Sequence, residues 1–143
     1  MGLTAWALCA ALHADPGLSQ RTADRGCALA PAVLAAPGDP TILLAVALRE
    51  SRFTPSAHRG RYCGAWQVSS HYGTSCADLQ RPAIAARVAA RLLAWFTRHR
   101  PHLDPLEAYA GCRSGCPEYV SAVRDRAARW RLHAERRFHA DND

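Results

Sequence analysis

Residues 40–57 read PTILLAVALRESRFTPSA, and this stretch indicates how the chain folds. It follows an aspartate that can cap a helix, and it begins with a proline, which suits the first helical position. A helix is therefore expected over residues 40–53. One face of that helix carries residues spaced three and four apart, which are Leu43, Val46, Ala47, Glu50 and Phe53.

The rest of the chain shows further helical patterns and almost no strand pattern. Helices are expected near residues 3–13, 21–35 and 82–99, in a short segment after Asp104, and from near Pro117 onward. Runs in which β-branched or aromatic residues alternate with polar ones are missing, so few strands are expected. The sequence thus predicts an all-α, mostly helical single domain. Its parts are N-terminal helices in 1–39, a long irregular cleft loop in 54–80 and a basic tail in 131–143, within a domain that spans 1–143.

Two of the later helices have a predicted buried face. In the segment 82–99 this face is expected to consist of Ile84, Val88, Leu92, Trp95, Phe96 and His99. In the last helix it is expected to consist of Val120, Val123, Ala127 and Trp130.

Composition and charge narrow the possible classes of protein. The chain has 143 residues, of which 49% are hydrophobic and 21% charged, as is typical of one globular domain. Its net charge is +6, and all 18 basic residues are arginines. Such a surface suits a polyanion, although a solvated basic surface explains it equally well. The arginine-rich segment from Arg124 to Arg137 is the candidate for contact with an anionic wall polymer or a membrane surface.

The six cysteines fit disulfide bonds in an oxidising compartment. The expected pairs are Cys63–Cys76, Cys112–Cys116 and Cys9–Cys27. Free buried thiols and a metal site are the alternatives. No short pair of cysteines has a second pair to complete a tetrahedron, and the histidines lack ligand spacing, so no metal and no cofactor are expected.

Glu50 is the carboxylate with unusual surroundings. It lies three, four and seven residues after Ala47, Val46 and Leu43, so its side chain shares their apolar face. Burial beside apolar groups disfavours the charged form of a carboxyl group and raises its pKa. A carboxylic acid that stays protonated near neutral pH can act as a general acid. The alternative is an ion pair with a nearby arginine, which also produces buried carboxylates.

Four short segments, in order, resemble the signature of the soluble lytic transglycosylases, and together they cover about residues 40–130. Residues 50–57 (ESRFTPSA) resemble that family's E-S-x-F-x-P-x-A, and residues 64–68 (GAWQV) are similar to its G-L-M-Q-I. Residues 108–111 (AYAG) resemble A-Y-N-A-G, and residues 119–123 (YVSAV) resemble Y-V-x-x-V.

The resemblance implies a lysozyme-like domain that cleaves the β-1,4 bond between N-acetylmuramic acid and N-acetylglucosamine in peptidoglycan glycan strands. In this family one glutamate protonates the glycosidic oxygen and then accepts the proton of the muramic acid 6-hydroxyl, which closes a 1,6-anhydro ring. Carried over, Glu50 is the acid and base. The residues that the resemblance implies for substrate binding are Ser51, Gln67, Tyr109, Trp66 and Tyr119, of which Trp66 would offer a stacking surface for sugar.

Two other functions stay open. A muramidase that hydrolyses the same bond needs a second carboxylate, but residues 52–77 contain no Asp or Glu, and Ser69 stands where goose-type lysozymes carry an aspartate. A non-catalytic wall-binding or virion structural module is favoured by Ala110, which replaces the family's asparagine. Nucleic-acid binding is not expected, because it leaves Glu50 unexplained.

The expected setting is the cell wall, reached from the periplasm, from outside the cell or as part of a virion, with a phage lysin as one origin. Residues 1–16 (MGLTAWALCAALHADP) resemble the apolar part of a signal peptide, but no cation precedes that part and no small-residue cleavage site follows it. We interpret the segment as the first helix. A monomer is expected.

Overall fold

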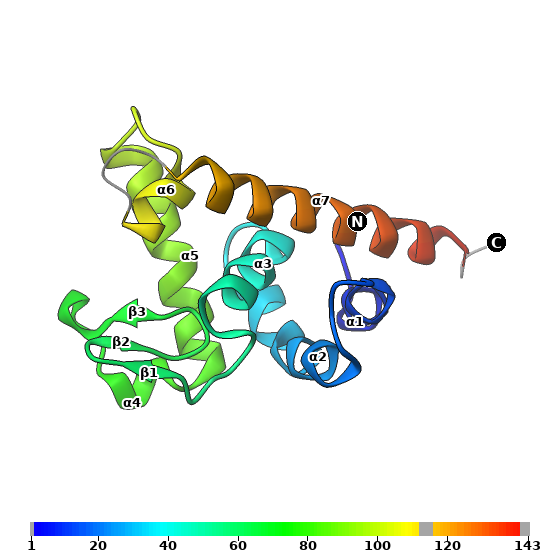
Figure 1. The fold of residues 1–143 in the computed structure, drawn as a ribbon, viewed down its shortest axis with the longest axis horizontal. Coiled ribbons are helices and arrows are strands. Elements are labelled where there is room, and N and C mark those ends of the chain that lie inside the picture. The colour runs from blue at the N-terminus through cyan, green and yellow to red at the C-terminus, as the bar shows by residue number, and fades with distance from the viewer. Residues whose placement is uncertain (1, 112–115, 141–143) are drawn as a thin grey trace.

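The computed structural model describes residues 2–111 and 116–140 and confirms the mostly helical fold (Figure 1). The longer helices are α1 (Ala5–Ala14), α2 (Gln20–Ala35), α3 (Pro40–Ser51), α5 (Pro82–His99) and α7 (Pro117–Ala140). Shorter elements are β1 (His58–Arg59), β2 (Tyr62–Cys63), β3 (Val68–Ser69), the 3-10 turn η1 (Ser70–Tyr72), α4 (Cys76–Leu79) and α6 (Pro105–Ala110). No helix in the described part of the chain is long and apolar enough to cross a membrane.

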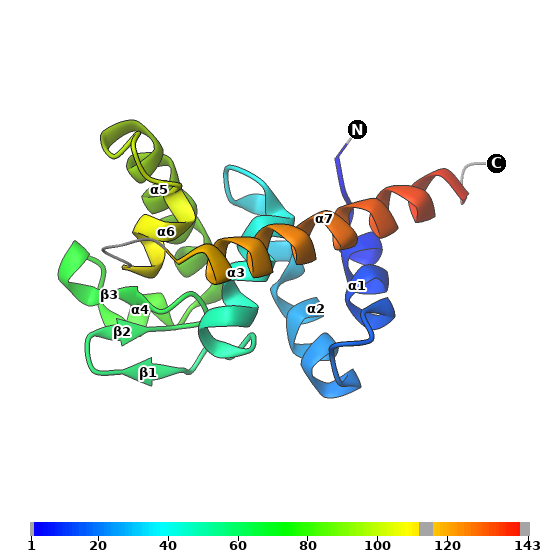
Figure 2. The ribbon, with the colours of Figure 1, turned by 45° about the horizontal axis from the view of Figure 1, so that its top comes forward.

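Helix α3 lies at the centre of the molecule and contacts α2, α5 and α7 (Figures 1 and 2). All six residues from 43 to 48 are buried, so this helix is covered on every side rather than on one face. Asp39 caps its start, because the carboxylate accepts hydrogen bonds from the backbone N–H of Thr41 at 2.9 Å and of Ile42 at 3.4 Å. The sequence predicted this helix and its cap, and the buried core holds its last turn in place.

The end of α3 differs from the prediction. The helix stops at Ser51, because Arg52 and Phe53 adopt left-handed backbone angles, with φ of 52° and 62°. This conformation is unfavourable for a bulky residue. Phe53 is nevertheless fully buried, its backbone N–H donates to the Ala47 carbonyl at 3.3 Å, and its ring lies 6.3 Å from that of Trp130. The core therefore fixes the direction in which the chain leaves α3, directly after Glu50.

The segment 54–80 is more regular than the sequence indicated. It folds into a three-stranded antiparallel sheet in the order β1-β2-β3, followed by η1 and α4. His58 pairs with Cys63 across the first ladder, and Cys63 pairs with Val68 across the second. Each strand has only two residues, which is too short for an alternating pattern to be visible in the sequence.

Two of the three predicted disulfides are confirmed. Cys9 and Cys27 join α1 to α2 with a Cα–Cα distance of 4.9 Å, and Cys63 and Cys76 join β2 to α4 with a distance of 5.4 Å. The third predicted pair includes Cys112, which lies outside the described residues. The Cys63–Cys76 bond connects the sheet to the short helix that supports it.

Removing the Cys63–Cys76 bond is expected to lower the free energy of unfolding by about 3 kcal/mol, because the bond closes a short loop in the unfolded chain. The double variant Cys63→Ser, Cys76→Ser tests this by denaturant unfolding. The matched control is Cys9→Ser, Cys27→Ser, which should lose a similar amount. The rate of amide hydrogen exchange in residues 58–72 should rise in the first variant only. An equal rise in both variants would contradict a local role of the Cys63–Cys76 bond in stabilising the sheet.

The predicted buried face of α7 is confirmed for three of its four residues, since Val120 is only half-buried, and the predicted face of α5 is wrong in part. Val123, Ala127 and Trp130 of α7 are buried. On α5, by contrast, Trp95 and His99 are exposed, and the buried residues are four alanines and Phe96. Alanine allows α5 to approach α2 closely, since the small side chains keep little distance between the helix backbones.

The basic segment 131–143 is described as far as residue 140, and up to there it continues α7 as helix. Some arginines of α7 are held by carboxylates of other elements, because Arg124 pairs with Asp104 at 2.7 Å and Arg131 with Asp39 at 2.7 Å. These pairs tie α7 to the turns before α3 and α6 and reduce the charge that this helix presents to a polyanion.

Candidate active site

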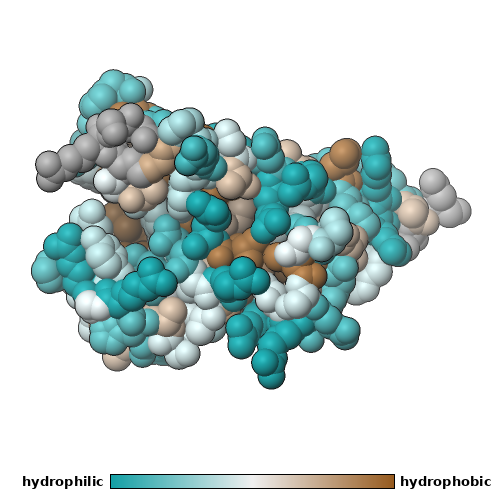
Figure 3. All heavy atoms as spheres, in the orientation of Figure 1, coloured by the Kyte–Doolittle hydropathy of each residue, from teal (hydrophilic) through white to brown (hydrophobic). Residues whose placement is uncertain are grey.

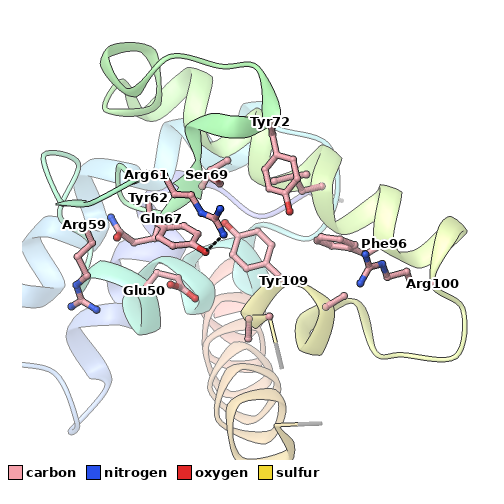
Figure 4. A pocket seen from close by; sticks show the side chains of 15 residues that line it. Glu50, Arg59, Arg61, Tyr62, Gln67, Ser69, Tyr72, Phe96, Arg100 and Tyr109 are labelled. Atoms are coloured by element: carbon pink, nitrogen blue, oxygen red, sulfur yellow. Dashed lines mark hydrogen bonds between the residues drawn. The ribbon is translucent and has the colours of Figure 1, made fainter. Parts of the chain in front are cut away.

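A cavity of about 530 Å³ lies between the small sheet and helices α5 and α6. Figure 3 shows the surface hollowed between the lobe of the sheet and the lobe of α6. Glu50 reaches it from the last turn of α3, the sheet and its connections supply one wall, and α5 and α6 supply the other. The lining side chains that bear on binding and chemistry are Glu50, Arg59, Tyr62, Gln67, Tyr72 and Tyr109 (Figure 4).

Glu50 is half-buried at the edge of this cavity, and its Oε1 accepts a hydrogen bond from the Tyr119 hydroxyl at 3.0 Å. Burial raises the pKa of the Glu50 carboxyl group above its usual value, while the Tyr119 hydrogen bond and the charges of Arg49 and Arg59 act in the opposite direction. The net direction is upward, as predicted from the apolar face. Glu50 therefore stays protonated to higher pH than an exposed glutamate, which a general acid requires.

Within the described part of the chain, no second carboxylate lines the cavity beside Glu50. Among the described residues that line the cavity, Glu50 alone carries a carboxyl group. Asp78, the first acid after the loop in sequence, lies on α4 outside the cavity, and its carboxylate is 4.0 Å from the Arg81 guanidinium. Ser69 stands at the cavity instead, and its hydroxyl accepts from the backbone N–H of His71 at 3.2 Å. A two-carboxylate glycosidase needs a partner that this part of the chain does not provide.

Gln67 lines the cavity from the connection between β2 and β3. Its backbone is left-handed, with φ of 48°, and its Nε2 donates to the Gly64 carbonyl at 2.9 Å. Unusual backbone angles in a non-glycine residue persist where the surroundings hold them, and such residues are frequent at functional sites. The remaining donor and acceptor atoms of the amide are available to a ligand in the cavity.

Tyr109 lines the cavity from α6 as predicted. Its hydroxyl donates to the Trp66 carbonyl at 2.6 Å, which connects α6 to the loop that carries Gln67. Burial and the nearby Glu50 charge raise the pKa of Tyr109 well above its usual value, so it stays protonated. Tyr109 is thus a fixed wall of the cavity and not a proton donor to substrate.

Trp66 does not offer the stacking surface that the sequence indicated. Its side chain is 0% exposed, and its indole N–H donates to the Leu43 carbonyl at 2.8 Å. The residue fills the core beneath α3, and its ring is closed off from the cavity. The expectation that Trp66 binds sugar is therefore wrong. Burying the large apolar indole ring in the core stabilises the fold more than leaving the ring exposed in the cleft would.

Ser51 and Tyr119 do not line this cavity, but Tyr119 contacts Glu50 and Ser51 joins the end of α3 to the loops that follow it. The Ser51 hydroxyl donates to the Ala65 carbonyl at 2.7 Å and accepts from the Thr54 backbone N–H at 3.0 Å. It thus makes hydrogen bonds within the protein both as donor and as acceptor. Tyr119 contacts Glu50, and burial together with the Glu50 charge raises its pKa, which keeps its hydroxyl a hydrogen-bond donor. Both positions hold the carboxyl group and the adjoining wall in place.

The structure adds lining residues that the sequence did not single out. Tyr62 is 41% exposed and Tyr72 is 62% exposed, and both line the cavity from the sheet side (Figure 4). Aromatic faces of this kind suit the apolar face of a sugar ring. In the sequence these two tyrosines stand in a glycine-containing loop, next to Arg61 and His71. No strand periodicity there indicated that they would face a cavity.

One group of described residues has the composition of a metal site. The ligand atoms of His58, Cys63 and Cys76 all lie within 4.8 Å of one another. The two sulfur atoms are joined in a disulfide, and only a thiolate binds a metal well, so the bond leaves one imidazole as the ligand of this group. The two cysteines of this group therefore form the disulfide that supports the sheet, and His58 lies beside that bond.

No protein-family model, no curated protein and no solved structure matches the chain in comparisons with known proteins. A functional assignment therefore depends on the chemistry of the site and on the resemblance of the four short segments.

Replacing Tyr119 by Phe is expected to move the pH dependence of activity. A Glu50 that acts as a general acid must be protonated, so the activity of such an enzyme would fall as the pH rises through the pKa of Glu50. The Tyr119 hydrogen bond lowers that pKa, and its loss raises it further. The falling limb of kcat/KM against pH should therefore move to higher pH. Tyr72→Phe, which removes a cavity hydroxyl without a bond to Glu50, is the control. A limb that moves to lower pH, or not at all, would contradict the assignment.

Proposed function

We propose that this protein is a lytic transglycosylase that cleaves the β-1,4 bond between N-acetylmuramic acid and N-acetylglucosamine in peptidoglycan. The observation that carries the proposal is Glu50, a half-buried carboxyl group with a raised pKa, at the edge of a cavity that has no second carboxylate among its described lining residues. The four segments that resemble the family support it, since they contribute Glu50, Gln67, Tyr109 and Tyr119.

The proposed reaction uses one residue twice. Glu50 donates its proton to the glycosidic oxygen, and the bond from that oxygen to C1 of the muramic acid breaks. The Glu50 carboxylate then accepts the proton of the 6-hydroxyl of the same sugar, whose oxygen attacks C1 and closes the 1,6-anhydro ring. Glu50 ends protonated, as it began, and no water is consumed. A raised pKa suits both steps, because the group must give and regain a proton near neutral pH.

The rest of the site supports binding and orientation. Tyr119 orients the carboxyl group, Gln67 offers hydrogen bonds to the sugar, and Tyr62 and Tyr72 offer faces for stacking. The two disulfides among the described residues fit an oxidising compartment, which supports action at the cell wall. A single chain contains all of these groups, so the proposal requires no partner subunit.

Digestion of purified peptidoglycan tests the proposal. The wild-type protein is incubated with insoluble peptidoglycan, and the soluble muropeptides are separated and identified by mass. The expected products are disaccharide peptides that end in 1,6-anhydro-N-acetylmuramic acid. If intact protein with both disulfides formed releases no soluble fragments, the catalytic proposal is contradicted and a non-catalytic wall-binding module becomes the better explanation.

A further inference from the structure

The small sheet and α4 bring a histidine and two cysteines together. His58 pairs with Cys63 across the ladder of β1 and β2, and side chains directly opposite in an antiparallel pair lie on the same face of the sheet. Cys76 begins α4, which contacts β2 (Figures 1 and 2). The ligand atoms of these three residues all lie within 4.8 Å of one another. One imidazole and two sulfur atoms therefore share one small region behind the sheet.

Contacts other than the Cys63–Cys76 bond also hold α4 against β2. Leu79 of α4 is fully buried, and its carbonyl oxygen lies so close to Gly64 that a Cβ atom at that position has no room. Gly64 directly follows Cys63, and Leu79 lies three residues after Cys76. The two sulfur atoms are therefore expected to stay close to each other when the bond between them is reduced.

The His58 ring is held as in a histidine that binds a metal. Its Nε2 lies 2.6 Å from the Gly60 carbonyl oxygen, which can only accept, so Nε2 carries a hydrogen. In the neutral ring the lone pair is then on Nδ1. Metal-binding histidines almost always donate their other N–H in this way, to a carboxylate, a backbone carbonyl or water, and this bond fixes the orientation of the ring.

The neighbouring arginine of β1 lies on the other face of the sheet. Arg59 pairs with Tyr62 at the next position of the ladder, and successive residues of a strand point to opposite faces. Arg59 and Tyr62 line the cavity beside Glu50 (Figure 4). The guanidinium of Arg59 therefore points away from the face that carries His58 and Cys63, where it would repel a cation.

Reduction of the Cys63–Cys76 bond turns the group into three ligands for a metal ion. A dithiol reductant attacks the bond and forms its own disulfide, so two electrons and two protons pass to the sulfur atoms and leave two thiols. The thiolate is the form that binds a metal, so each thiol releases its proton on coordination. Two metal–sulfur bonds and one metal–nitrogen bond then form, with no change in the oxidation state of the metal.

Two thiolates and one imidazole suit zinc, because thiolates select soft or borderline metals whereas carboxylates and carbonyls suit Mg²⁺ and Ca²⁺. Zn²⁺ binds sulfur at about 2.3 Å and nitrogen at about 2.0–2.1 Å in a tetrahedron, which places the ligand atoms about 3.5–3.8 Å apart. Atoms that already lie within 4.8 Å of one another reach this arrangement by small side-chain rotations. Water supplies the fourth ligand, and the two thiolates balance the charge of the ion.

We propose that the protein binds one Zn²⁺ through His58, Cys63 and Cys76 when a dithiol reduces the Cys63–Cys76 bond, so that the ion replaces the disulfide as the link between β2 and α4. In a reducing compartment the sheet that forms one wall of the cavity thus keeps the support that the disulfide gives it in an oxidising one. The inference goes beyond the proposed function and does not depend on it.

Zinc binding by the reduced protein tests the inference. Four cysteines are first changed to serine, so that only one pair remains; they are Cys9, Cys27, Cys112 and Cys116. This variant is reduced with a phosphine, separated from the phosphine without air, and titrated with Zn²⁺ against a chromogenic chelator. The reduced variant should take up one Zn²⁺ per chain and the oxidised variant none. Equal uptake in both states, or uptake in neither, would overturn the inference.

A histidine replacement identifies the third ligand. His58→Ala in the same background should weaken Zn²⁺ binding by at least about tenfold, since the imidazole ligand is lost. The matched control is His71→Ala, which removes an exposed histidine of the nearby turn η1 and should leave the affinity unchanged. The same loss in both variants, or a loss in neither, would overturn the role of His58.

A second measurement applies if the four-serine variant does not fold. Fully reduced wild-type protein should bind one Zn²⁺ per chain more than fully reduced Cys63→Ser, Cys76→Ser, and equal binding would overturn the inference. Zn²⁺ should also slow amide hydrogen exchange in residues 58–72 of the reduced wild-type protein. Exchange that is equally fast with and without Zn²⁺ would contradict the link between β2 and α4. None of these measurements uses peptidoglycan, so their outcome leaves the proposed function untouched.

Discussion

Glu50→Gln is expected to lower the rate of glycan cleavage by roughly a thousandfold, because the amide can neither donate a proton to the glycosidic oxygen nor accept one from the 6-hydroxyl. The two side chains have nearly the same shape, and the amide still occupies the position beside Tyr119. The rate of release of soluble muropeptides from purified peptidoglycan measures the effect. A residual rate within tenfold of the wild-type rate would contradict the role of Glu50.

The same variant is expected to fold at least as well as the wild type. The pKa of Glu50 is raised in the folded protein, so the protonated form is the one that folding favours. Its contribution to stability is present below the unfolded-state pKa and is lost as the pH rises through the higher, folded-state pKa. At neutral pH ionisation of this carboxyl group is more favourable in the unfolded chain than in the folded protein, which disfavours the folded state, and glutamine removes that effect. Thermal unfolding at neutral pH should give a Tm equal to or above that of the wild type, which separates loss of chemistry from loss of structure.

Gly64→Ala is expected to have the largest effect on stability. Gly64 has a φ of 83°, and a Cβ atom at this position would lie 1.9 Å from the backbone carbonyl oxygen of Leu79. Real atoms do not approach so closely, so either the loop with Gln67 or the end of α4 must move. Left-handed strain costs about 1–2 kcal/mol and overpacking about 1–3 kcal/mol, so we expect the free energy of unfolding to fall by about 3 kcal/mol or more.

Gly38→Ala is the matched control for this effect. Gly38 has a φ of 92°, close to that of Gly64, but a Cβ atom there meets nothing within 4 Å. Its replacement should cost only the backbone strain, about 1–2 kcal/mol. Denaturant unfolding of the two variants measures the difference, which reports the contact with Leu79. Equal losses of stability in both variants would show that the contact between residue 64 and the Leu79 carbonyl adds nothing to the cost of the substitution.

Part of the fold is predictable directly from local signals in the sequence. The start of α3 was predictable because Asp39 and Pro40 form a helix beginning and the apolar residues after them repeat at helical spacing. The end of α3 was not, because the left-handed turn at Phe53 is imposed by burial of its ring beside Trp130. Tertiary packing, rather than local preference, sets that boundary.

The buried face of α5 shows a second limit. Periodicity selects large apolar residues, and it therefore assigned Trp95 and His99 to the core. The structure buries four alanines and Phe96 of α5 instead, where this helix packs on its neighbours, α2 among them. Alanine contrasts little with its neighbours in hydropathy, so the sequence pattern does not reveal such a face.

Residues of the candidate site were predictable where the local sequence sets their position. They were not predictable where the tertiary fold sets the direction in which a side chain points. Glu50 was predictable from its place on an apolar face, and Tyr109 from its segment's resemblance to the family. Trp66 was assigned to sugar binding by residue type, yet its ring is turned into the core. Tyr62 was missed because its strand has only two residues, and Tyr72 because it lies in the short turn η1.

The source of the oxygen at the new chain end tests the single-glutamate mechanism most directly. Peptidoglycan is digested by the wild-type protein in water enriched in heavy oxygen, and the released muropeptides are weighed by mass spectrometry. The mechanism predicts products that are lighter by one water molecule than the hydrolytic ones and that carry no heavy oxygen, because the 6-hydroxyl of the sugar is the nucleophile. Products with a reducing end that carries one heavy oxygen atom would show that water attacks C1, and they would make the protein a hydrolase.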